Sequence, residues 1–195
     1  MEALLTSTAV VALAEIGDKT MLLAIVLAAR LRAPWQILAG IFAATILNHA
    51  LAALLGSEVA GLIDAPWFRI AVALGFIAMA AWTLVPDKFD DDEGFTRRGS
   101  AFLTTAVAFF LVEMGDKTQI ATIALGAQYH DVVAVATGTT LGMMIANGPA
   151  VFLGEELVKR VSLKATRLAA ALLFLLLGLW QLADIAGLFR PALGG

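Results

Sequence analysis

Two copies of one charged six-residue segment interrupt an otherwise apolar sequence. They run from Glu15 to Thr20, reading EIGDKT, and from Glu113 to Thr118, reading EMGDKT. Each copy supplies two carboxylates, and carboxylate oxygens in a chain without cysteine favour hard divalent cations such as Mn²⁺, Ca²⁺ or Mg²⁺. The sequence therefore predicts a cation site with four carboxylate ligands: Glu15, Asp18, Glu113 and Asp116.

Polar side chains near these carboxylates form a predicted supporting set. Its members are Lys19, Thr20, Lys117, Thr118, Gln119, Asn48 and Asn147. On a continuous helix the two carboxylates and the lysine of each copy share one face, whereas Thr20 and Thr118 need local unwinding to join it. The glycine in each copy favours such unwinding and a close approach of two helices. Interhelical hydrogen bonding is the alternative role for the two asparagines, and His49 is either a proton relay or a histidine satisfied within the core.

The charges of the two copies indicate what the site exchanges. Four carboxylates and two ammonium groups sum to −2 when all are ionised, and a dry site of that charge needs a neutralising partner. Burial and mutual repulsion favour the protonated form of the carboxyl groups, so the empty site should take up protons. Because one divalent cation can replace two protons without changing the total charge, we predict cation/proton exchange at a ratio of about one to two.

The composition places these charges in a membrane protein. Of 195 residues, 61% are hydrophobic and 15% are charged, with a mean hydropathy of +0.89, whereas soluble domains carry about 25% charged residues. This excludes a soluble enzyme, and the net charge of −3 indicates no nucleic-acid partner. We expect an all-α protein with six transmembrane helices, since about twenty apolar residues cross a bilayer. The expected spans are 3–29, 35–55, 68–85, 100–127, 132–153 and 168–188.

An offset of 98 residues aligns the two halves of the chain without a gap. It pairs the two charged segments and also pairs Gly40 with Gly138. Because each copy has an odd number of spans, three, the second copy enters the membrane from the opposite side and is inverted relative to the first. In transporters this architecture places the binding site near the midplane of the membrane. We predict three parts: a first repeat at 1–86, an acidic cytoplasmic linker at 87–99 and a second repeat at 100–195. The acidic run from Asp90 to Glu93 is either a solvated linker or a cation-collecting patch.

The basic residues predict how the chain crosses the membrane. Nine lysines and arginines lie in the loops after the first, third and fifth expected spans, and two lie on the opposite side. Positively charged loops are retained in the cytoplasm. We therefore expect both termini to lie outside the cytoplasm.

The paired E-x-G-D-K-T motifs, one in each three-span half, resemble those of the Gdt/MneA-type family of small cation/proton exchangers. The resemblance covers nearly the whole chain. It implies that Glu15, Asp18, Glu113 and Asp116 bind the transported cation and that H⁺ is the counter-ion. Family members move Mn²⁺ or Ca²⁺ out of the cytoplasm, and a chain this compact is similar to the bacterial members. The resemblance thus implies a manganese exporter of the bacterial inner membrane. From the inverted repeats we expect alternating access, and we expect no bound cofactor.

Two other functions fit part of the pattern. An exporter of an amino acid or other small solute would need a roomier, less acidic site. An intramembrane aspartyl protease also uses two aspartates and a Gly-Asp pair, but the only tyrosine here, Tyr129, is followed by His130 rather than by aspartate. We therefore expect a secondary transporter rather than an enzyme. The sequence leaves open the preference between Mn²⁺ and Ca²⁺, the affinity and the oligomeric state.

Overall fold

The computed structural model describes residues 1–62, 66–85, 99–154, 156 and 162–187. All regular structure in this part of the chain is helical, which confirms the predicted all-α class. The helices are α1 (Glu2–Glu15), α2 (Lys19–Leu31), α3 (Pro34–Leu62), α4 (Pro66–Thr83), α5 (Ala101–Glu113), α6 (Lys117–Tyr129), α7 (Val132–Leu153) and α9 (Leu163–Ile185). The linker predicted at 87–99, with its acidic run, lies outside the described residues except for Gly99.

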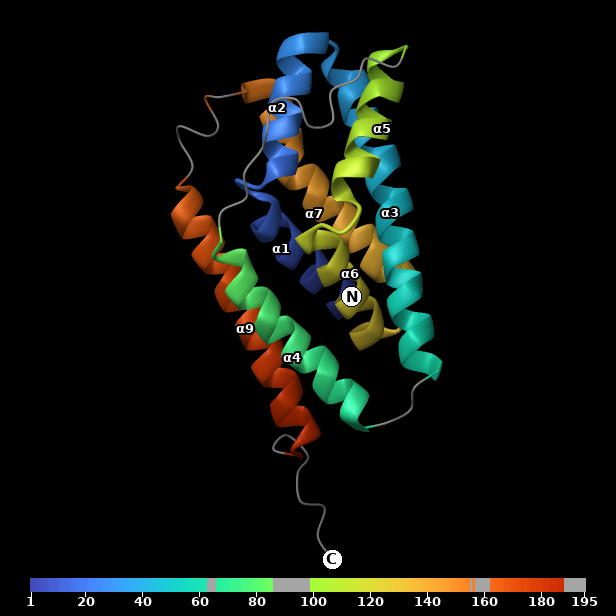
Figure 1. The fold of residues 1–195 in the computed structure, drawn as a ribbon, viewed down its shortest axis with the longest axis vertical. Helices are drawn as coiled ribbons and strands as arrows, with labels where there is room; N and C mark the ends of the chain where they lie inside the picture. The colour runs from blue at the N-terminus through green and yellow to red at the C-terminus, as the bar shows by residue number, and fades with distance from the viewer. Residues whose placement is uncertain (63–65, 86–98, 155, 157–161, 188–195) are drawn as a thin grey trace, which may run out of the picture.

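The first and fourth predicted spans are each divided into two helices (Figure 1). α1 ends at Glu15 and α2 begins at Lys19, and α5 and α6 are separated in the same way between Glu113 and Lys117. The expectation that each charged segment presents one face of a continuous helix was therefore wrong. The segments lie at breaks between two short helices, and the physical reason is the glycine turn described below.

The distribution of polar and apolar side chains suits a protein surrounded by lipid. Large apolar side chains such as Phe42, Leu51 and Leu176 are exposed. By length and composition, α3, α7 and α9 can cross a membrane, and α4 and α5 are shorter apolar helices. The interior, by contrast, holds buried glutamate, aspartate, lysine and histidine side chains. Ionisable groups at such depth mark functional sites in membrane proteins.

The two halves of the chain are interleaved. α1 packs against α7, α3 packs against α5 and α6, and α4 and α9 lie along each other (Figure 1). The contacts recur at the offset of 98 residues. A Cβ on Gly40 would lie 2.7 Å from the carbonyl oxygen of Phe102, and a Cβ on Gly138 would lie 2.5 Å from that of Leu4. Both helix pairs require glycine, because any side chain would collide with the backbone of the neighbouring helix.

Candidate cation site

Each charged segment forms a tight turn that interrupts its helix. The amide of Asp18 donates to the carbonyl oxygen of Glu15 at 3.0 Å, and the equivalent bond in the second copy is 3.1 Å. Between these residues Ile16 has φ −66° and ψ 110°, and Gly17 has φ 86°, which are angles of a type II turn. That turn needs a positive φ at its third residue, where glycine fits without strain. The E-x-G-D spacing is thus the spacing of a turn.

The turn places the carboxylates at helix ends. The two glutamates are the last residues of α1 and α5, and Asp18 and Asp116 are the N-caps of α2 and α6. The Asp116 side chain accepts a hydrogen bond from the Thr118 amide at 3.4 Å, whereas Asp18 makes no capping bond with its side chain. A helix N-terminus carries a partial positive charge, so the starts of α2 and α6 favour anionic groups at this position.

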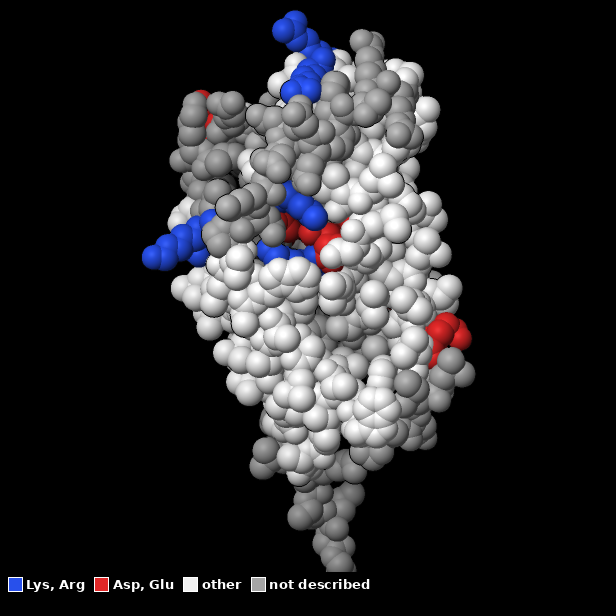
Figure 2. Space-filling view, viewed as in Figure 1, with Lys and Arg blue, Asp and Glu red and all other residues white. Residues whose placement is uncertain are grey.

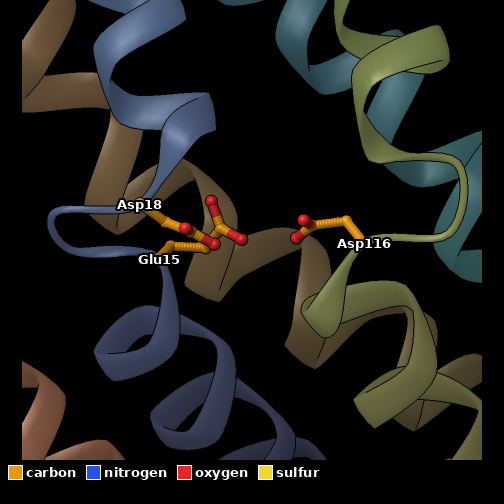
Figure 3. Close-up of side chains that lie close together, drawn as sticks. All are labelled: Glu15, Asp18 and Asp116. Carbon is orange, nitrogen blue, oxygen red and sulfur yellow. The ribbon is translucent and has the colours of Figure 1, made fainter. Parts of the chain in front are cut away.

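Three of the four predicted carboxylates meet in one buried cluster. Glu15, Asp18 and Asp116 each offer an oxygen within 4.8 Å of the other two, and none is more than 5% exposed. In Figure 3, Glu15 and Asp18 extend from the α1–α2 turn and Asp116 extends toward them from the α5–α6 turn. Oxygens on opposite sides of one Ca²⁺ ion are about 4.6–5.2 Å apart, given metal–oxygen distances of about 2.3–2.6 Å. The spacing therefore suits a single divalent cation.

The fourth predicted carboxylate, Glu113, has a different partner. Its Oε1 lies 3.1 Å from Nε2 of His49, and both side chains are fully buried. Glu113 lies outside the group of three oxygens. His49 is thus bonded to a predicted ligand, a contact that the sequence did not indicate.

The two motif threonines join the carboxylates because the helices are broken. Thr20 Oγ1 donates to Oε2 of Glu15. Thr118 Oγ1 donates to Oδ2 of Asp116 at 3.2 Å. The local unwinding that the sequence required for these threonines is therefore present in both copies.

The two motif lysines make different contacts in spite of their equivalent positions. Lys19 Nζ lies 2.9 Å from Oδ1 of Asp116, so it connects the first copy of the motif to the second. Lys117 Nζ donates to the carbonyl oxygen of Val85 at 3.2 Å and lies 6.0 Å from the centre of the Trp82 ring. The Lys19 side chain is 24% exposed, whereas Lys117 is buried.

The remaining members of the supporting set bond to the backbone in the described part of the chain. Asn48 on α3 donates to the carbonyl oxygen of Phe110 on α5 at 3.1 Å, which is the interhelical bond considered as its alternative role. Asn147 donates to a carbonyl oxygen one turn earlier in its own helix at 3.2 Å. Gln119 accepts a bond from the Gly115 amide at 2.7 Å and so braces the second turn.

A small hollow of about 10 Å³ lies beside the cluster, with room for about one water molecule. It is lined by Ala14, Ile16, Gly17, Asp18, Thr83, Lys117 and Arg167. Figure 2 shows acidic side chains recessed at mid-height on one face of the molecule, with basic side chains beside them. Sequence reasoning missed Thr83 and Arg167 here.

Comparison with known proteins places this arrangement in a family. The chain matches the family described as "Divalent cation/proton antiporter GDT1" over residues 3–91 and 101–187. The chain belongs to this family. The match falls into two parts, one in each half of the chain, as an internal repeat would produce. The protein is therefore a multi-pass membrane transporter whose substrates are divalent cations and protons, and it is not an enzyme.

Individual relatives agree with this assignment. A Vibrio cholerae protein named "Putative manganese exporter" is 48% identical over 180 residues, which cover 92% of this chain and 90% of that protein. "GDT1-like protein 3" of Arabidopsis thaliana is 29% identical, with 89% and 68% covered. "GDT1-like protein sll0615" of Synechocystis is 29% identical, with 85% and 89% covered. No solved structure matches the chain. Family membership decides against both the solute exporter and the protease.

Proposed function

We propose that this protein exports Mn²⁺ from the cytoplasm in exchange for protons, at a site built on Glu15, Asp18 and Asp116. Glu113 is the fourth proposed ligand and reaches the ion by turning away from His49. Ca²⁺ is the alternative substrate, because both ions accept carboxylate oxygens. The 48% identity to a Vibrio cholerae protein named for manganese export supports Mn²⁺.

The observation that carries the proposal is the burial of Glu15 beside two other carboxylates. Its side chain is completely buried, and Oε1 has no hydrogen-bond partner among the described residues. Two more carboxylates lie within 4.8 Å of it. An ionised carboxylate in such surroundings is costly unless a proton or a cation neutralises it. Because the proton and the cation compete for the same oxygens, binding of one releases the other, and this is what exchange requires.

Six spans in two inverted three-helix repeats carry the site in this proposal. α1 and α2 together form the first span, and α5 and α6 together form the fourth, with α3, α4, α7 and α9 as the others. Discontinuous helices with ligands at their break are common in secondary transporters. The matching backbone contacts of Gly40 and Gly138 support the repeat. In this proposal both termini lie outside the cytoplasm of a bacterial inner membrane, an orientation that the nine basic loop residues support.

The packing of α4 and α9 supports alternating access. This pair packs against α1 and α6, which form the outer half of the protein in the proposed orientation. The hollow beside Asp18 is lined by Thr83, at the end of α4, and by Arg167, near the start of α9. Both are cytoplasmic ends in the proposed orientation, so the hollow lies on the cytoplasmic side of the cluster in this proposal. Movement of the pair toward α2 and α5 would expose the site to the opposite side.

Flux in proteoliposomes tests the proposal. The protein is reconstituted with a Mn²⁺-sensitive dye inside, a proton gradient is imposed, and the assay is repeated with Ca²⁺. We expect Mn²⁺ flux that follows the pH gradient and exceeds Ca²⁺ flux. Glu15→Gln should abolish this flux, whereas Glu2→Gln, the same change at an exposed position, should retain it. Faster Ca²⁺ flux would reassign the substrate, and Mn²⁺ flux that ignores the proton gradient would overturn the exchange mechanism.

A further inference from the structure

We propose that the Lys19 ammonium group is an internal competitor of the transported cation. It occupies Asp116 while no metal ion is bound, and it must withdraw before the ion binds. The inference rests on the proposed function, because it concerns the same site. It gives Lys19 the role of setting the affinity for the ion rather than that of a ligand.

The geometry at Asp116 is the basis of this inference. Lys19 Nζ lies 2.9 Å from Oδ1 of Asp116. Asp116 is itself 4% exposed and is one of the three clustered carboxylates. A divalent ion held by that carboxylate would bring two positive charges next to the ammonium group, at a distance where like charges repel strongly. The ion and the ammonium group therefore exclude each other from Asp116.

Lys19 can withdraw without a change in the fold. It is the first residue of α2, and its side chain is 24% exposed. A flexible four-carbon stem allows the ammonium group to move away from Asp116 while the backbone stays in place. Helix stability does not account for a lysine here, because the start of a helix carries a partial positive charge that disfavours cations.

The equivalent lysine of the second copy, Lys117, makes contacts of another kind. Lys117 is buried, bonds to the carbonyl oxygen of Val85 and lies near the Trp82 ring. An ion bound at the carboxylates would leave these contacts in place. Lys19, by contrast, bonds to an oxygen that the ion needs. We therefore assign the competitor role to Lys19.

Direct Mn²⁺ binding tests the inference without transport. Purified protein in detergent is titrated with Mn²⁺, and the free ion is quantified by its electron paramagnetic resonance signal. Because the ion no longer has to displace an ammonium group, Lys19→Gln should lower the Kd about fivefold, the scale of a partly exposed ion pair. Lys19→Met, which retains most of the side-chain volume, should lower it likewise and serves if the Gln variant folds poorly.

Two control variants isolate the competing charge. Lys19→Arg retains a cation within reach of Asp116 and should keep the Kd within about twofold of the wild-type value. Arg30→Gln removes the same charge from the exposed end of α2, about 16 Å along the helix axis. It should also change the Kd less than about twofold, because salt screens exposed charges beyond about 10 Å.

The outcomes separate this inference from the proposed function. An unchanged or higher Kd in folded Lys19→Gln and Lys19→Met protein would overturn the competitor role and leave Lys19 as a structural link between the two turns. If wild-type protein binds Mn²⁺ no more tightly than Asp116→Asn, the proposed cation site itself fails. In proteoliposomes, Lys19→Gln should lower both KM and kcat for Mn²⁺, because an ion that binds more tightly is released more slowly. Loss of a merely structural link would not lower KM.

Discussion

The turn in the second copy of the motif depends on Gly115, and Gly115→Ala should weaken cation binding. Gly115 has a φ of 78°, and a Cβ at this position would meet nothing within 4 Å. The cost of the substitution is therefore backbone strain alone, without a clash. For a residue with a side chain, the left-handed conformation costs about 1–2 kcal/mol.

The strain affects cation binding because a second backbone conformation, a continuous helix, is open to this segment. Alanine is the strongest helix former, and a helix continued through 114–116 would relieve the strain. It would also remove the turn that directs Asp116 toward Glu15. A shift of about 1–2 kcal/mol toward that alternative lowers the ratio of turn to continued helix by a factor of about 5–30, and it raises the Kd for Mn²⁺ by up to that factor.

Mn²⁺ titration and thermal unfolding of Gly115→Ala and Gly75→Ala protein test this reasoning. Gly75 lies within α4, and a Cβ there also meets nothing within 4 Å. Because its backbone is helical, alanine at position 75 should stabilise the protein by about 0.5–1 kcal/mol and leave the Kd unchanged. A wild-type Kd in the Gly115→Ala protein would refute the idea that the turn conformation controls the site.

Two further perturbations address proton competition and helix packing. The Kd for Mn²⁺ should rise as the pH falls, because protons take the carboxylates of the empty site; release of two protons per ion corresponds to about a hundredfold per pH unit. A titration series over pH measures this slope, and a Kd independent of pH would contradict competition. Gly138→Val should destabilise the protein by about 1–3 kcal/mol, since a Cβ lies 2.5 Å from the Leu4 carbonyl oxygen. Thermal unfolding measures this loss of stability, with Gly61→Ala as the control because a Cβ at position 61 meets nothing within 4 Å. Equal stability of the two variants would argue against a tight α1–α7 contact.

The sequence was sufficient for the protein class and for naming three carboxylates that lie together in the structure. Its hydrophobic content predicts a membrane protein, and the two E-x-G-D-K-T copies supply four carboxylates, of which Glu15, Asp18 and Asp116 cluster and Glu113 does not. The turn was also encoded, because a glycine two residues after glutamate suits a type II turn. Apolar residues on both sides concealed it, since hydropathy does not report a local change in φ.

Only the tertiary structure decided which partners the equivalent residues of the two copies contact. The two copies are alike in sequence, yet Glu15 faces Asp18 and Asp116 whereas Glu113 faces His49, whose counterpart at the 98-residue offset is Asn147. Spacing along the chain determines which residues share a turn, and it carries no information about which residue of the other half lies opposite. That choice depends on how the interleaved helices of the two halves pack against each other.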